Sequence, residues 1–252
     1  MEIEGKHAMV VGGASGMGRA SAELLRTRGA SVAVLDLPTS DGESVAKSLD
    51  GSFHPCDVMD ADSVERAVND AVAALGGLHI AVNTAGGGTS QRTINREGPM
   101  PLEAFRHVID LNLIATFNLN RLQAWTMSQN EPVDDERGVM INTASIAAFE
   151  GQIGQVAYSA AKAGITGMML TMARDLGGVG VRVMAIAPSL FSTGLTAGIP
   201  AEMEAELTRD AAFPKRMGRP EEYARLAVAI VENPMLNGGT IRLDGAQRFS
   251  PK

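Results

Sequence analysis

Cysteine, tyrosine and tryptophan are scarce in this chain of 252 residues, which has one cysteine, two tyrosines and one tryptophan. The single cysteine, Cys56, excludes a disulfide within the chain and argues against a metal site built on thiolates, so we predict no metal. A buried apolar position is the ordinary place for such a residue. The two tyrosines are therefore the more informative of the scarce residues.

Long apolar runs and basic clusters are also missing. No apolar run reaches the roughly 18 residues that a membrane-spanning helix needs, and the opening MEIEGK is acidic rather than an apolar or arginine-rich leader. The formal net charge is −7, so the basic footprint of a nucleic-acid-binding protein is lacking. We expect no membrane or nucleic-acid partner and a reducing compartment, most simply the cytoplasm.

Apolar segments alternate with stretches of helical period along the whole chain. The apolar segments predict seven strands, at 7–12, 31–36, 51–55, 78–83, 138–145, 181–188 and 240–245. They are nearly continuously apolar, as strands are when helices cover both faces of a parallel sheet. We predict one α/β domain over residues 1–252, with a seven-stranded, mostly parallel, doubly wound sheet. Segments 87–100 and 189–215 are predicted to be mobile, the second as a substrate lid.

The stretch 60–77 shows the helical pattern most clearly. Asp60 is a predicted N-cap, Gly76–Gly77 is a predicted stop, and one apolar stripe runs between them. The stripe consists of Val64, Ala67, Val68, Ala71 and Leu75.

A glycine-rich turn follows the first strand, in VVGGASGMGRA. Gly12, Gly16 and Gly18 lie where a Rossmann-type fold brings the pyrophosphate of a dinucleotide against backbone amides and a helix N-terminus. Asp36 ends the second strand, where a carboxylate accepts hydrogen bonds from both adenosine ribose hydroxyls and repels a 2′-phosphate. This pattern favours NAD over NADP. Asp57 and Val58 are predicted to meet the adenine.

The second group of polar residues follows the fifth strand. Ser145 ends that strand, and Tyr158 and Lys162 lie at positions i and i+4 of a predicted helix, so both can face one ligand. Oxidation of a carbinol needs a base for the hydroxyl proton. A nearby ammonium and a positive nicotinamide ring would lower the pKa of the Tyr158 phenol, and Ser145 can hold the substrate oxygen.

These motifs together resemble the short-chain dehydrogenase/reductase family from end to end. The resemblance rests on Gly12/Gly16/Gly18, Asp57, the Asn-x-Ala-Gly of residues 83–86, Asn112, Ser145, Tyr158, Lys162 and Pro188…Thr193. It implies a catalytic tetrad in which Tyr158 is the acid/base and Lys162 binds the nicotinamide ribose and lowers the tyrosine pKa. Asn112 would position a water in a proton relay. Its sequence context, VIDLNLIATF, on its own predicts a satisfied polar residue of a buried helix.

With the turn and the resemblance taken together, the predicted NAD contacts span most of the carboxyl edge of the sheet. They are Gly12, Ser15, Gly16, Met17, Gly18, Asp36, Leu37, Asp57, Val58, Asn83, Ala85, Gly86, Tyr158, Lys162, Pro188, Phe191 and Thr193. One departure from the family pattern is Val11, which stands where a threonine is usual. We expect the loss of a hydroxyl that ties the turn to neighbouring backbone.

Within the family the chain is similar to the branch of 3-hydroxyacyl-CoA dehydrogenases, in segments such as INTASIAAFEGQIGQVAYSAAKAGI and ENPMLNGGTIRLDGAQR. That branch implies an NAD-dependent homotetramer of fatty acid metabolism that acts on short and branched 3-hydroxyacyl-CoA esters and on some steroids. Its interfaces would use helices around 103–128 and 155–177 and the C-terminal strand. The segment 87–100, which borders the predicted substrate mouth, differs from its counterpart in that branch.

The substrate itself stays open between several alternatives. Gln152, Gln155 and Leu195 are predicted substrate contacts, although a turn or cap role suits the two glutamines equally well. Arg92 and Arg96 either contact CoA phosphates or are solvated loop residues. The alternatives to an acyl-CoA dehydrogenase are a dehydrogenase of another secondary alcohol such as a hydroxysteroid, a 3-oxoacyl reductase, and a non-catalytic binding protein on the same fold.

Overall fold

A parallel sheet forms the centre of the computed structural model, which describes residues 1–194 and 199–250. Within these residues the sheet has seven strands in the order β3-β2-β1-β4-β7-β8-β9, and every neighbouring pair is parallel. The strands are β1 (His7–Val11), β2 (Ser31–Asp36), β3 (Ser52–Pro55), β4 (Ile80–Asn83), β7 (Gly138–Thr143), β8 (Val181–Pro188) and β9 (Thr240–Leu243). The strand order reverses between β1 and β4, so the predicted doubly wound sheet is confirmed.

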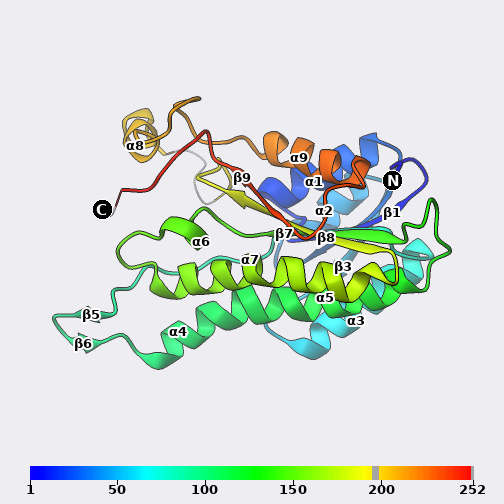
Figure 1. Ribbon diagram of the computed structural model, residues 1–252, viewed down its shortest axis with the longest axis horizontal. Coiled ribbons are helices and arrows are strands. Elements are labelled where there is room, and N and C mark those ends of the chain that lie inside the picture. Colours follow the sequence, from blue (N-terminus) through cyan, green and yellow to red (C-terminus); the bar gives the residue numbers. More distant parts are fainter. Residues whose placement is uncertain (195–198, 251–252) are drawn as a thin grey trace.

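Helices cover both faces of the sheet, as Figure 1 shows. One face carries α1 (Gly16–Thr27), α2 (Gly42–Ser48) and α9 (Pro220–Glu232), and the other carries α3 (Ala61–Leu75), α5 (Ala115–Ser128) and α7 (Val156–Gly177). A separate apolar core fills each of the two interfaces. Strand residues such as Val10, Val34 and Ile141 are therefore fully buried, which explains their continuously apolar sequences. None of the described helices is long and apolar enough to cross a membrane.

The helix predicted within 60–77 forms with the predicted ends. The Asp60 carboxylate accepts the Asp62 amide at 3.0 Å, and Gly76 closes the helix in the left-handed conformation at φ 80°. These contacts satisfy backbone groups that the first and last turns of a helix leave unpaired. The stripe residues from Val64 to Ala71 are buried against the sheet, and Leu75 packs beside them.

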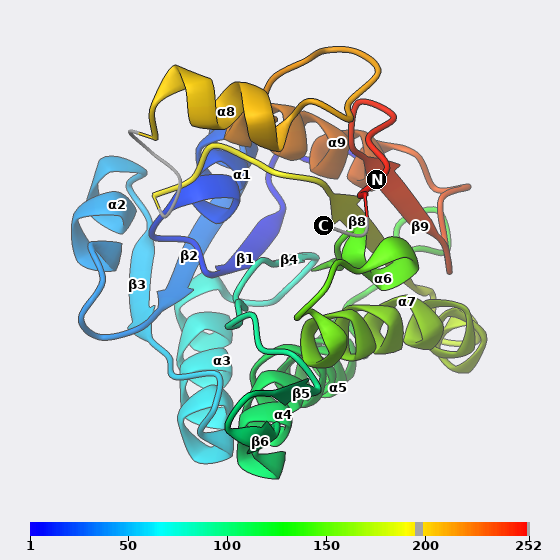
Figure 2. The ribbon, with the colours of Figure 1, turned by 90° about the vertical axis from the view of Figure 1, so that its left-hand side faces the viewer.

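Two segments extend beyond the carboxyl end of the sheet, one on either side of it (Figures 1 and 2). The first contains the helix α8 (Ala201–Leu207), and the second contains a hairpin of β5 (Ile94–Asn95) and β6 (Gly98–Pro99). The hairpin lies within the segment 87–100, whose predicted mobility stays a prediction, and its strands were not predicted. The Asn95 side chain accepts the amides of Glu97 and Gly98 and so makes the turn, but strands of two residues carry no periodicity from which they can be predicted. The remaining helices are α4 (Leu102–Ile109), which continues through the π-helical turn η1 (Asp110–Ile114) into α5, and α6 (Ala147–Glu150).

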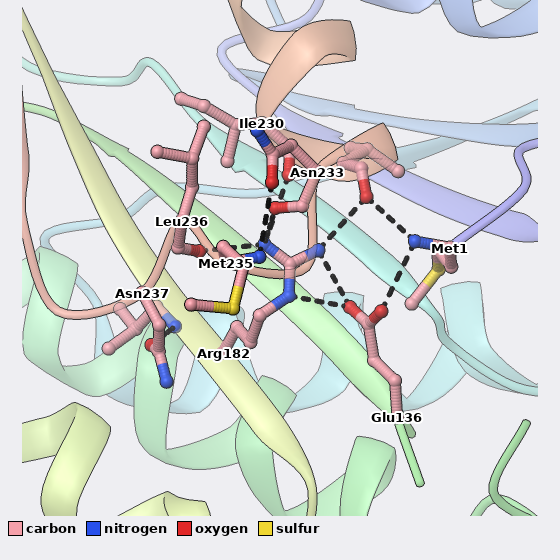
Figure 3. Close-up of polar contacts among 10 residues, drawn as sticks. Met1, Glu136, Arg182, Ile230, Asn233, Met235, Leu236 and Asn237 are labelled. Atoms are coloured by element: carbon pink, nitrogen blue, oxygen red, sulfur yellow. Dashed lines mark hydrogen bonds and ion pairs between the residues drawn. The ribbon is translucent and has the colours of Figure 1, made fainter. Parts of the chain in front are cut away.

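A buried guanidinium fastens α9 to the amino end of strand β8 (Figure 3). Arg182 on β8 donates to the carbonyl oxygens of Ile230 at 3.0 Å and Val231 at 2.9 Å, in the last turn of α9. These carbonyls lack partners inside the helix, and a cation also suits the negative end of the helix dipole. Glu136 accepts from Arg182 at 2.7 Å and from the Met1 amino group at 3.1 Å, which balances the buried charge. The cluster thus holds one helical layer onto the sheet.

We expect Arg182→Met to lower the free energy of unfolding by about 3–5 kcal/mol, because it leaves Glu136 and the helix carbonyls buried with too few donors. Urea denaturation followed by circular dichroism measures the change. Arg106→Met is the matched control, since Arg106 pairs with Glu103 where both side chains are more than half exposed, and it should change stability by less than about 0.5 kcal/mol. Equal effects of the two substitutions would contradict the role assigned to the cluster.

Candidate active site

The glycine turn between β1 and α1 needs glycine for its backbone conformation and for close packing against Thr84. Gly12 and Gly16 have positive φ values of 77° and 51°, which suit glycine, and a Cβ on Gly12 would lie 2.7 Å from Thr84 Oγ1. The Ser15 side chain makes no capping hydrogen bond at the start of α1. The amides of this helix N-terminus therefore remain able to bind an anion.

Thr84 fixes this turn, a role that the sequence did not reveal. Its hydroxyl lies 2.9 Å from the carbonyl oxygen of Val11 and 3.2 Å from that of Gly12, and it donates its one proton to the nearer of these acceptors or shares it between them. The hydroxyl that Val11 lacks is thus supplied from the end of the neighbouring strand β4. The position of Thr84 directly after a predicted strand was its only sequence signal.

A cleft of about 760 Å³ runs along the carboxyl ends of β1, β2 and β4, at the strand-order reversal where such sheets bind ligands. Twelve of the predicted NAD contacts line it: Gly12, Ser15, Gly16, Met17, Gly18, Asp36, Leu37, Asp57, Val58, Ala85, Gly86 and Thr193. The lining also includes Cys56, Met59, Thr84 and Leu111, which were not predicted as cofactor contacts. Residues from six separate chain segments therefore meet at one edge.

Asp36 is held rigidly at one end of the cleft. Its carboxylate accepts the Ala14 amide at 2.9 Å and the Leu37 amide at 2.8 Å. A carboxylate has about four lone-pair sites, so two remain for the hydroxyl groups of a ribose. The geometry fits the adenosine end of NAD, with the glycine turn beside it for the pyrophosphate.

Five predicted cofactor residues lie outside this lining: Tyr158 and Lys162, which are described below, and Asn83, Pro188 and Phe191. The Asn83 side chain is 4% exposed and bonds the amides of Gln123 and Asn142 at 2.9 and 3.0 Å, because it points toward α5 rather than into the cleft. Phe191 packs on Gly218 and lines a neighbouring cavity of about 330 Å³, and Pro188 is buried at the end of β8. The structure therefore gives Asn83 a structural role instead of the predicted contact. Leu195 lies outside the described residues.

Three of the four predicted catalytic residues, Asn112, Tyr158 and Lys162, lie beside the backbone of Gly86–Gly88, and Gly86 itself lines the cleft. The Tyr158 phenol hydrogen-bonds to Ser145, and Lys162 Nζ lies 5.5 Å from the centre of the Tyr158 ring. A Cβ on Gly86 would meet both the Asn112 amide oxygen, at 2.7 Å, and Lys162 Nζ, at 3.4 Å. The sequence-based grouping of these residues thus agrees with their geometry.

Asn112 lies in the π-helical turn η1. The sequence predicted a helix here but not its π-helical turn. Its amide nitrogen donates to the carbonyls of Gly87 and Val108 at 2.7 and 2.8 Å, and its amide oxygen accepts the Gly87 amide at 3.1 Å. The side chain therefore clamps the backbone that follows β4. Its part in a water relay stays a prediction. π-helical turns in α-helices are often found at functional sites.

Burial sets the electrostatics of the catalytic pair. It lowers the pKa of the Lys162 ammonium to about 8. It raises the pKa of the Tyr158 phenol, and the hydrogen bond with Ser145 offsets only part of that rise. Loss of hydration therefore dominates the tyrosine pKa in the protein without NAD, and the lowering of this pKa by the ammonium and the nicotinamide ring together stays a prediction. The ammonium donates to the carbonyl of Thr143 at 2.8 Å.

The two predicted substrate glutamines make contacts within the loop before α7. Gln155 accepts the Gln152 amide at 3.0 Å, which is the turn role left open as an alternative. Gln152 also lines a groove of about 580 Å³ with Arg92 and Ile94 of the hairpin segment. Among the described residues no group of three or more histidine, cysteine, aspartate or glutamate side chains could hold a metal ion.

Known proteins match this chain over nearly its whole length. The family of short chain dehydrogenases matches residues 6–204. Human 3-hydroxyacyl-CoA dehydrogenase type-2 is 50% identical over 99% of this chain and 97% of its own. The crystal structure of the 3-hydroxyacyl-CoA dehydrogenase type-2 from Mycobacterium avium superposes with a TM-score of 0.94 at 42% identity, covering 98% of each chain.

A more distant solved structure extends the comparison to a bound cofactor. A 7α-hydroxysteroid dehydrogenase in complex with NADH and 7-oxo glycochenodeoxycholic acid has a TM-score of 0.87 at 27% identity, and the match covers 100% of this chain and 97% of that one. Fold, site residues and sequence matches agree on one assignment. The chain belongs to the short-chain dehydrogenase/reductase family.

Proposed function

We propose that this chain is an NAD-dependent dehydrogenase that interconverts (S)-3-hydroxyacyl-CoA and 3-oxoacyl-CoA esters. The observation that carries the proposal is the convergence of Ser145, Tyr158 and Lys162 beside Gly86, which lines the same cleft as Asp36. The acyl-CoA substrate is supported by the 50% identity to human 3-hydroxyacyl-CoA dehydrogenase type-2. Such an activity belongs to fatty acid metabolism.

The residues divide the chemistry among them. Bound NAD would supply the hydride acceptor for C3 of the alcohol. The Tyr158 oxygen takes the hydroxyl proton during oxidation and returns it during reduction. Ser145, which hydrogen-bonds Tyr158, is placed to hold the substrate oxygen as charge develops on it. Lys162 would bind the ribose beside the nicotinamide and favour the charged form of the phenol.

A homotetramer is part of the proposal. Phe117 and Trp125 on α5 and Leu170 on α7 are 49%, 71% and 52% exposed, and both helices lie on the segments through which the family resemblance implies subunit contact. Large exposed apolar side chains of this kind are suited to burial against another copy of the chain.

Oxidation of NADH with acetoacetyl-CoA tests the substrate assignment. We expect the purified protein to consume NADH and form 3-hydroxybutyryl-CoA, with a higher kcat/KM than for a 7-oxosteroid or a simple ketone. Absorbance at the nicotinamide band measures the rate. If only the steroid or the simple ketone reacts, the chain is a dehydrogenase of a different secondary alcohol, the alternative that the 7α-hydroxysteroid dehydrogenase likeness favours.

Tyr158→Phe should reduce kcat by about 10²–10⁴-fold, because the acid/base group is lost while the ring that fills the site remains. NADH titration by nicotinamide fluorescence should give nearly the wild-type dissociation constant. A variant that keeps a tenth or more of the wild-type kcat would remove Tyr158 from the acid/base role.

Asp36→Asn should reduce the preference for NAD over NADP by about tenfold, since the carboxylate no longer repels a 2′-phosphate while an acceptor for the Ala14 amide is retained. The ratio of kcat/KM with the two cofactors measures the preference. Asp57→Asn is the control, because this carboxylate also lines the cleft but is not assigned to the ribose. An unchanged ratio in the Asp36 variant would contradict the cofactor assignment.

A further inference from the structure

Lys162 depends on a main-chain group for its position. Its side chain is almost fully buried, and its ammonium donates to the carbonyl oxygen of Thr143, the last residue of β7, at 2.8 Å. A buried ammonium needs such an acceptor, because its hydration is lost. The location of the Thr143 carbonyl therefore decides where the charge lies relative to Tyr158 and the cleft.

The hydroxyl of Thr143 takes part in a directed chain of hydrogen bonds. It lies 2.7 Å from the carbonyl oxygen of Asn83 and 2.7 Å from the hydroxyl of Tyr223. A carbonyl only accepts, so Thr143 spends its one proton on Asn83, and the Tyr223 hydroxyl must donate to Thr143. The phenol is fully buried and its pKa is raised by that burial, so it stays protonated as this direction requires.

This series of hydrogen bonds connects both helical layers at the carboxyl end of β7, where the Thr143 carbonyl accepts from Lys162. Tyr223 belongs to α9 and lies in the core of one face, whereas Lys162 belongs to α7, which packs on the other face. Asn83 ends β4, the strand beside β7. Thr143 is thus held from one layer by its hydroxyl and holds the other through its carbonyl.

We propose that Thr143 and Tyr223 are positioning residues that place the Lys162 ammonium for catalysis and for cofactor binding. The inference rests on the proposed dehydrogenase function and adds two residues that touch neither substrate nor cofactor. Tyr223 acts through the Thr143 hydroxyl, and Thr143 acts through its own carbonyl. Small displacements of a catalytic group are sufficient to slow catalysis, since about 1 Å of misplacement can cost 10²-fold in rate.

Three substitutions separate positioning from mere stability. Thr143→Val keeps the shape and removes the hydroxyl, Thr143→Ser keeps the hydroxyl, and Thr143→Val combined with Tyr223→Phe also removes the phenol that the valine leaves unpaired. The measurements are kcat with NADH and acetoacetyl-CoA, the NADH dissociation constant by nicotinamide fluorescence, and the midpoint of thermal unfolding.

We expect Thr143→Val to reduce kcat by about tenfold and to weaken NADH binding about threefold, whereas Thr143→Ser stays within about threefold of the wild-type kcat. The thermal midpoint should fall in the valine variant and partly recover in the double variant, because an unpaired buried phenol is costly and removal of both partners is much less so. The double variant should nevertheless keep the reduced kcat.

The control is Thr240→Val on β9, a strand of the same sheet. The Thr240 hydroxyl is buried without a hydrogen-bond partner in the described structure, so its removal should leave kcat and NADH binding unchanged and the thermal midpoint unchanged or higher. A kcat that recovers together with the midpoint in the double variant would overturn the positioning role. So would a Thr143→Val variant with wild-type kcat and NADH affinity.

The outcome can be separated from that of the proposed function. If the wild-type protein does not reduce acetoacetyl-CoA, the acyl-CoA assignment fails, but kcat is then measured with the ketone that the wild-type protein does reduce. NADH affinity and the thermal midpoint need no substrate. The same comparison of variants then supports or overturns the positioning role on its own.

Discussion

The carbonyl group of Thr143 is the point on which the site depends, because it accepts the buried ammonium of Lys162. That acceptor is available only at the end of β7, where the ladder of strand hydrogen bonds stops and backbone groups become free for side chains. All seven main strands of the described chain are parallel, so their carboxyl ends lie at the same edge of the sheet. The architecture thus brings the cofactor cleft and the catalytic group together.

The fold and much of the site could be predicted from the sequence because both rest on short-range patterns. Continuously apolar segments follow from burial on both faces, and they located all seven strands to within a few residues. The glycines of the β1–α1 turn and the carboxylate at the end of β2 act through local backbone geometry, so their spacing was sufficient to place them in the cleft. Tyr158 and Lys162 share a helix face for the same local reason.

What escaped prediction depends on contacts between distant segments. Asn83 ends a strand at the correct edge, but the direction of its side chain follows from Gln123 and Asn142, which are 40 and 59 residues away. Thr84 replaces a hydroxyl that is missing at Val11, and the two meet only because β4 pairs with β1. The π-helical turn at Asn112 likewise has no marker in its own residues. Contacts between remote elements decide the first two of these features.

The pKa values of Tyr158 and Lys162 bear on the direction of the reaction. Burial raises the pKa of the Tyr158 phenol and lowers the pKa of Lys162 to about 8, so each group is pushed toward its neutral form. A neutral phenol is the proton donor that ketone reduction requires, so the protein by itself holds the residue ready for that direction. Alcohol oxidation needs the phenolate, which must then be favoured by positive charge close to it. The placement of Lys162 by Thr143 therefore matters most for alcohol oxidation, because the ammonium then stabilises a negatively charged phenolate rather than a neutral phenol.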